Sequence, residues 1–112
     1  MTDTDIYKRE PLTLGEIQAQ CGLDSQRWFP ATSQNVAFMT LALCGEAGEL
    51  ANLIKKVERG SSTVDDSVEA VHSEIVDVLI YVANLANATG LDLEQAYIAK
   101  RSFNEKRFGI HA

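Results

Sequence analysis

Two long apolar segments dominate the chain and restrict the folds open to it. From about Ser33 to Val57, and again from Asp66 to about Ala88, apolar residues recur at steps of three and four. This spacing puts them on one face of an α-helix, whereas a half-buried strand alternates apolar and polar residues. No segment shows such alternation. The sequence therefore predicts an all-α protein.

Helix start and stop signals accompany these segments. Three predicted starts carry an N-capping residue followed three residues later by Glu or Gln: Thr13 and Glu16, Asp66 and Glu69, Asp92 and Gln95. The first of these opens a short helix that should end near Cys21 and Gly22, and the last opens a helix that should end near Phe108 and Gly109. A break at residues 59–63 separates the two long helices.

The arrangement of these helices follows from their connections. Two long helices joined by a loop of roughly ten residues pack antiparallel, with the shorter helices completing the core. We expect one domain over residues 1–112, folded as a four- to five-helix bundle. The apolar residues of 36–57 and 75–88 nearly encircle their helices, which is more than four helices of one small chain can cover. A homodimer or homotetramer is therefore expected.

Charge and composition narrow the possible partners. The net charge of −6, from 10 basic and 16 acidic residues, argues against nonspecific binding to a nucleic-acid polymer. The first ten residues lack the apolar run of a signal peptide, and no later stretch reaches the ~18 uncharged apolar residues of a membrane span. We expect a cytoplasmic protein with no membrane partner. Cys21 and Cys44 are isolated and are expected to be reduced core residues.

Pairs of acids three residues apart are the candidates for chemistry, although their spacing alone proves nothing. Sixteen acids in 112 positions give about two such pairs by chance, and the chain has three: 46 and 49, 66 and 69, 74 and 77. Asp66 and Glu69 lie at a predicted helix start, where carboxylates act as caps. Four acids instead interrupt the most apolar helix segments: Glu46, Glu49, Glu74 and Asp77.

A cation is needed where four such acids converge. Burying a carboxylate costs several kcal/mol unless a cation or hydrogen bonds compensate. Lys55 and Lys56 are the nearest basic residues and offer one alternative, simple ion pairing. Hard oxygen ligands favour Mg²⁺, with Mn²⁺ as a second choice, and four of them suit more than one ion. A di-iron site is disfavoured, because the chain has a single Glu-x-x-His, Glu69 to His72, and that histidine is expected to be a surface or packing residue.

Two glycines lie beside the first acidic pair. Gly45 and Gly48 each cost a helix about 1 kcal/mol relative to alanine. We expect them to let another helix or a ligand approach the backbone, the alternative being a tolerated packing site.

The combined pattern resembles a known family. Glu46-x-x-Glu49, then 24 residues, then Glu74-x-x-Asp77 is similar to the metal-binding signature of the MazG-like all-alpha NTP pyrophosphohydrolases. The resemblance extends to residues 34–50 and 74–81 and to the terminal helix at 100–108, and covers about residues 26–108. It implies an enzyme that cleaves a nucleoside triphosphate between the α- and β-phosphates, giving the monophosphate and pyrophosphate. Mg²⁺ held by the four acids would neutralise phosphate oxygens and lower the pKa of the attacking water.

The resemblance also suggests roles for other residues. Many family members carry a glutamate immediately before the first Glu-x-x-Glu, but here that position is Gly45, as in the branch that resembles dCTP pyrophosphatases. The general base therefore stays open among Glu46, Glu49 and ionisation of water by the metal. Three residues on one face of the last helix would hold phosphate, unless they are only a solvated basic helix end: Lys100, Asn104 and Arg107.

Aromatic and amide side chains are the candidates for binding the nucleobase. Those proposed to stack on it or to read its edge are Trp28, Phe29, Asn35, Tyr81 and Asn84. Each aromatic has core packing as its alternative. The rival to an enzyme is a noncatalytic helical oligomerisation or regulatory module whose acids bind Lys or Arg of a partner.

Overall fold

The protein is all-α, as the apolar spacing predicted. A computed structural model describes residues 11–60 and 63–109, without the side chains of 64–66. The described chain contains the α-helices α2 (Leu14–Ser25), α3 (Val36–Glu58), α4 (Val64–Thr89) and α5 (Leu93–Phe108), and the short 3₁₀-helix η1 (Ser33–Asn35) directly before α3. These ranges include no strand. The first turn of the predicted 33–57 helix is therefore 3₁₀ rather than α.

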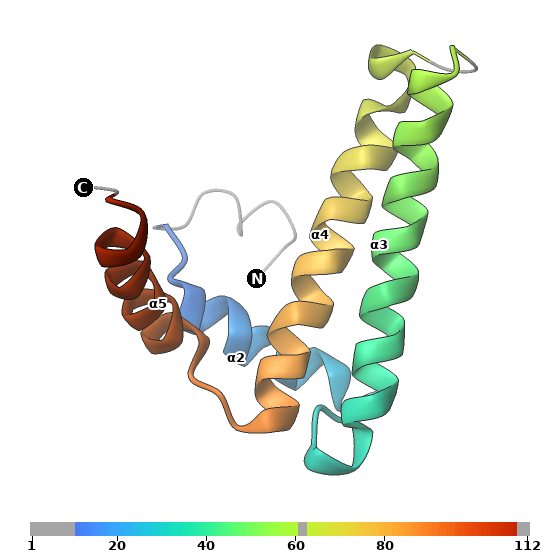
Figure 1. Ribbon diagram of the computed structural model, residues 1–112. Coiled ribbons are helices and arrows are strands. Elements are labelled where there is room, and N and C mark those ends of the chain that lie inside the picture. Colours follow the sequence, from blue (N-terminus) through green and yellow to red (C-terminus); the bar gives the residue numbers. More distant parts are fainter. Residues whose placement is uncertain (1–10, 61–62, 110–112) are drawn as a thin grey trace.

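The long helices α3 and α4 form an antiparallel hairpin, as predicted (Figure 1). α2 crosses the end of this hairpin where α3 begins and α4 finishes, and it packs mainly against α4. α5 follows α4 after a bend of 100° and packs against α2. Within one chain, the shorter helices therefore cover only one end of the hairpin.

Two of the predicted helix caps are confirmed. Thr13 Oγ1 accepts a hydrogen bond from the Glu16 N–H at 3.0 Å, and Glu16 Oε1 accepts one from the Thr13 N–H at 3.1 Å. Asp92 Oδ1 accepts from the Gln95 N–H at 3.1 Å at the start of α5. These bonds satisfy backbone donors that a helix start leaves unpaired. Gly109 ends α5 with φ at +66°, a left-handed conformation that glycine adopts readily.

Two predicted helix boundaries are wrong. α2 continues to Ser25, past the expected end at Cys21 and Gly22. A Cβ at position 22 would lie 2.9 Å from Nδ2 of Asn87, so Gly22 allows α2 to approach α4 instead of ending the helix. α4 begins at Val64, before Asp66, so the predicted capping residue lies inside the helix. The side chain of Asp66, and Ser61 and Ser62 of the predicted break, lie outside the described residues.

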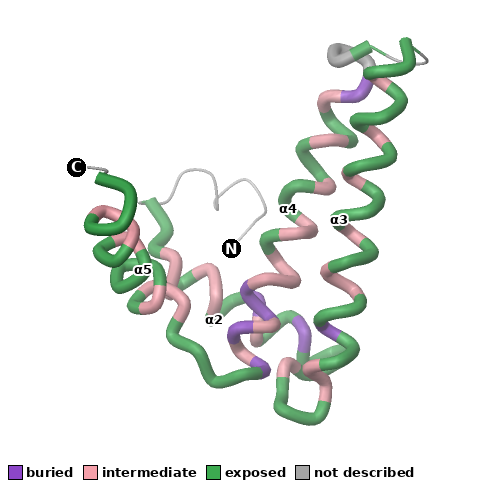
Figure 2. The backbone as a smooth tube through the Cα atoms, viewed as in Figure 1, coloured by how far each residue is buried: buried purple, intermediate pink, exposed green. Residues whose placement is uncertain are grey.

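Most of the buried residues gather where α2 crosses α4, and Ser67 is buried near the other end of the hairpin (Figure 2). Those at the crossing come from three helices: Cys21 and Ser25 of α2, Met39 of α3, and Ala83, Asn84, Ala86 and Ala88 of α4. The alanines of α4 keep this crossing close. Cys44 is exposed, so the expectation that both cysteines are core residues is wrong for this one, whereas Cys21 is buried and both are free thiols. The reason is that Cys44 lies on a face of α3 that no other described helix covers.

The remainder of the hairpin exposes much apolar surface. Leu41 of α3 is 71% exposed, and Ile75 and Val76 of α4 are about half exposed. The segment Ser33–Glu58 is long and apolar enough, by length and composition alone, to cross a membrane, and only 6% of its most apolar stretch is buried. The sequence had not suggested this. The core helices of soluble proteins, which are mostly buried, and signal sequences meet the same criterion, and this segment carries Glu46 and Glu49.

Candidate active site

Three of the four predicted acids converge between α3 and α4. Glu46 comes from α3, and Glu74 and Asp77 come from consecutive turns of α4. One carboxylate oxygen from each lies within 4.8 Å of the others. Residues three apart share a face of a helix, and the antiparallel hairpin turns the two faces toward each other. The helical spacing of the acids and the antiparallel packing together bring three carboxylates into one cluster.

The fourth acid, Glu49, lies one turn further along α3 and is exposed. Its negative charge helps to raise the pKa of Glu74, so its carboxylate belongs to the same electrostatic neighbourhood. Three half-buried carboxylates and one exposed carboxylate therefore lie close together.

The cluster has buried oxygens that no protein donor satisfies. Oε2 of Glu46 and Oε2 of Glu74 are inaccessible to solvent and accept no hydrogen bond. Among the described residues, neither Lys55 nor Lys56 pairs with these acids, and the ion pair present is Arg101 to Glu105 on α5, at 3.6 Å. An unpaired buried carboxylate oxygen is costly unless a proton or a metal ion compensates it. The donor set fits a hard divalent cation such as Mg²⁺.

Protonation shows how strongly the acids interact. The pKa of Glu74 is raised to about 7, first because its carboxyl group shares a hydrogen bond with Glu46, then by burial and by the charges of Glu49 and Glu46. Protonation of Glu74 lowers the repulsion between the carboxylates, as a bound cation would.

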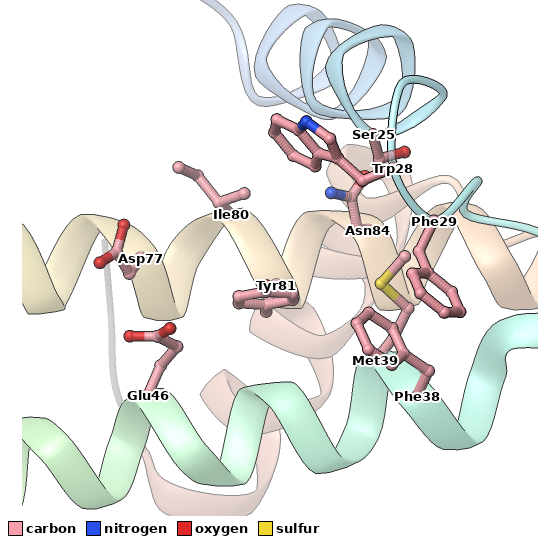
Figure 3. Close-up of a pocket in the computed structure, with 10 residues that line it drawn as sticks. All are labelled: Ser25, Trp28, Phe29, Phe38, Met39, Glu46, Asp77, Ile80, Tyr81 and Asn84. Atoms are coloured by element: carbon pink, nitrogen blue, oxygen red, sulfur yellow. The ribbon is translucent and has the colours of Figure 1, made fainter.

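A cavity of about 360 Å³ extends from the acids along the hairpin (Figure 3). Glu46 and Asp77 lie at one end, and aromatic side chains surround the other. Four residues predicted to contact a nucleobase line it: Trp28, Phe29, Tyr81 and Asn84. Asp77, Tyr81 and Asn84 follow one another at i, i+4 and i+7 on one face of α4, which explains how a single helix serves both ends.

Four further lining residues were not predicted: Ser25, Phe38, Met39 and Ile80. Phe38 stacks on Phe29, with ring centroids 3.9 Å apart and planes inclined by 11°. Helical spacing had placed Phe38 among the apolar residues of the first long segment, without indicating whether it faces the core or a cavity. Nothing in the sequence indicates that Phe38 pairs with the loop residue Phe29.

The other predicted binding residues lie elsewhere. Asn35 does not line the cavity, and its Nδ2 donates to the carbonyl of Pro30 at 2.7 Å, which holds the loop that carries Trp28 and Phe29. The three predicted phosphate contacts are on α5, which packs against α2 and contributes nothing to the cavity: Lys100, Asn104 and Arg107. Their roles stay predictions.

The two glycines beside the first acidic pair and the Glu-x-x-His motif have no neighbour within the described chain that explains them. A Cβ at Gly45 or Gly48 would meet nothing within 4 Å, so within one chain no neighbour uses the space these glycines leave. Glu69 and His72 are both exposed on α4, and the expectation of a surface or packing histidine is confirmed as a surface one.

An all-α hairpin that combines an oxygen-ligand cation site with an aromatic cavity is suited to a molecule with phosphate groups and a planar ring. Comparison with known proteins gives the family. Residues 34–106 match the model of the MazG nucleotide pyrophosphohydrolase domain, and the chain belongs to that family.

Individual relatives agree with this. The chain is 39% identical over 77 residues to dCTP pyrophosphatase 1 of Mus musculus, and 35% identical over 77 residues to that of Homo sapiens; each match covers 65% of this chain and 45% of the relative. It is 35% identical over 74 residues to the gene 37 protein of Mycobacterium phage L5, covering 64% of this chain and 63% of that protein. The chain thus spans about half to two thirds of these relatives. No solved structure gives a significant match.

The first prediction concerns metal binding. A cation that binds only the folded protein stabilises it, by about 2.7 kcal/mol at a concentration 100 times its dissociation constant. Mg²⁺ should therefore raise the melting temperature of the protein, and Glu74→Gln should abolish the rise. Glu69→Gln, which removes an exposed acid from the same helix, is the matched control and should keep it. An equal Mg²⁺ shift in all three proteins would contradict the site.

The second prediction concerns pH in the absence of metal. Because the pKa of Glu74 is about 7 in the folded protein and 4.5 in the reference state, the folded state holds its proton more tightly. This contribution to stability is complete below pH 4.5 and is lost as the pH rises through 7. Urea unfolding in EDTA should show a fall in stability over this range, and Glu74→Gln should have a flatter profile. Parallel profiles would contradict the raised pKa.

Proposed function

We propose that this protein is a Mg²⁺-dependent nucleoside triphosphate pyrophosphohydrolase that cleaves between the α- and β-phosphates, with Mn²⁺ able to replace Mg²⁺. The observation that carries the proposal is the cluster of Glu46, Glu74 and Asp77, with its unsatisfied buried oxygens, at the end of an aromatic cavity. Family membership supports the reaction class. The cavity gives the nucleobase a place beside the phosphates.

The chain's own residues divide the work. Glu46, Glu49, Glu74 and Asp77 would hold the metal, which when bound supplies charge neutralisation at the phosphate oxygens and a lowered pKa for the attacking water. Trp28, Phe29 and Tyr81 would bind the base by stacking. We assign the general base to Glu46 or Glu49; the exposed carboxylate of Glu49 can pass a proton to solvent, which favours it for this role.

The substrate and its setting are part of the same proposal. The relatives named as dCTP pyrophosphatases support a preference for deoxypyrimidine triphosphates and a housecleaning role in nucleotide metabolism. A net charge of −6 supports free nucleotides rather than a nucleic-acid polymer as ligands, because their phosphates arrive with cations. We place the protein in the cytoplasm, where such pools are found.

Assembly completes the proposal. The uncovered apolar surface of the α3–α4 hairpin supports a homodimer or homotetramer, since monomers rarely expose such patches. Within one chain α5 lies away from the cavity. The proposed phosphate contacts of Lys100, Asn104 and Arg107 therefore require α5 of another copy, or a movement of α5.

The activity is tested by incubating the protein with a panel of NTPs and dNTPs and Mg²⁺. We expect a nucleoside monophosphate and pyrophosphate as products, and a loss of at least ~100-fold in kcat for Asp77→Asn and Glu49→Gln. Glu69→Gln should retain activity. Release of orthophosphate alone would contradict the cleavage position. Full activity in Asp77→Asn, with no Mg²⁺-dependent melting shift, would favour a noncatalytic helical module.

Assembly is tested by light scattering coupled to gel filtration. Leu41→Glu puts a charge on the exposed hairpin face and should lower the measured mass to that of one chain, because burying an unpaired carboxylate costs several kcal/mol. Leu12→Glu changes another exposed leucine, outside the hairpin, and should leave the mass at that of the wild-type protein. A wild-type mass of one chain at high concentration would refute the assembly.

A further inference from the structure

A chain of three side-chain amides connects α2 and α4 behind the cavity. It begins at backbone groups whose donor or acceptor character is fixed. The Leu93 N–H donates to Gln18 Oε1 at 2.9 Å, so Gln18 Nε2 is the donor to the Leu91 carbonyl at 2.6 Å and to Asn87 Oδ1 at 3.0 Å. The orientation of the Gln18 amide is therefore determined by the main chain.

The same logic fixes the next two amides. Since Asn87 Oδ1 accepts from Gln18, its Nδ2 is the donor, to the Gln18 carbonyl at 2.9 Å and to Asn84 Oδ1 at 3.3 Å. Asn84 Oδ1 is then an acceptor turned toward Asn87. The Nδ2 of Asn84 must point the other way.

That direction leads into the cavity. Asn84 is a cavity-lining residue, 97% buried, and Figure 3 shows its amide nitrogen projecting from α4 between Trp28 and Tyr81. No described residue accepts a hydrogen bond from this nitrogen, and the nitrogen is accessible from the cavity. Because the cavity reaches this donor, a ligand atom in the cavity can accept its hydrogen bond in place of water.

The location suits one end of a nucleotide. Asn84 lies seven residues after Asp77, a rise of roughly 10 Å along the helix. A bound nucleotide whose phosphates contact the acids would bring its base to Asn84, between Trp28 and Tyr81.

We infer that Asn84 determines base specificity as a hydrogen-bond donor, and that Asn87 and Gln18 are positioning residues that fix its orientation. This inference rests on the proposed nucleotide substrate. The base edge facing α4 must then present an acceptor, either a carbonyl oxygen or an unprotonated ring nitrogen. An exocyclic amino group at this place would set a donor against a donor.

Binding measurements test this independently of hydrolysis. We compare, by calorimetry with Mg²⁺, the four deoxynucleoside 5′-monophosphates with 2-deoxyribose 5-phosphate, which has no base. Wild-type protein should bind the preferred nucleotide more tightly than the sugar phosphate. Asn84→Ala and Asn84→Asp should reduce that ratio of affinities about 10- to 100-fold, because the donor is lost. An unchanged ratio, or no preference for any nucleotide in the wild-type protein, would overturn the inference.

The positioning role has its own readout. Asn87→Asp has nearly the same shape but cannot donate to Asn84 Oδ1, so it should reduce the same affinity ratio about 10-fold. Asn52→Asp, an exposed change on α3, is the matched control. If Asn87→Asp lowers stability but leaves the ratio intact, Asn87 is only structural. Failure of the proposed hydrolysis would instead appear as missing pyrophosphate while the binding ratios hold.

Discussion

The apolar contact between α3 and α4 is the interaction on which the rest of the molecule depends. It forces Glu46 against Glu74 and Asp77, whose charges oppose the packing that brings them together. Two buried oxygens remain without donors, and the pKa of Glu74 rises to about 7. Hydrophobic packing thus holds the carboxylates in a mutually repulsive arrangement that a bound divalent cation would relieve. Binding of such a cation would therefore stabilise the folded hairpin.

The same hairpin organises the rest of the site. One face of α4 carries Asp77, Tyr81 and Asn84 in succession, so the cation site and the far end of the cavity have a fixed separation. A rigid helix can set such a distance more accurately than a loop can. The loop after α2 supplies Trp28 and Phe29, with Phe29 stacked on Phe38 of α3. The helices thus fix the separation and carry two of the aromatic side chains, Phe38 and Tyr81, and the loop adds the other two.

Periodicity and capping rules predicted the helices, because these features depend on local sequence. The hairpin was predicted from the short connection between the two long helices, and the acid cluster from the spacing of the acids and the family resemblance. What the sequence could not show was which neighbour each face meets. Cys44 was expected in the core but lies on an uncovered face of α3. Gly22 was interpreted as a helix stop, although it serves close packing against Asn87. Phe38 and Met39 line the cavity because distant segments of the chain meet there, and the spacing of apolar residues does not show which segments meet.

Gly22 has a consequence that reaches beyond helix packing. Because a Cβ there would meet the amide of Asn87, and Asn87 in turn orients Asn84, a residue outside the cavity affects which group faces the ligand. Substitutions in α2 can then change the ligand preference while the carboxylates and the aromatic side chains of the cavity stay the same. Relatives that share all four acids need not share a substrate, and differences at the α2–α4 crossing are where their preferences would diverge.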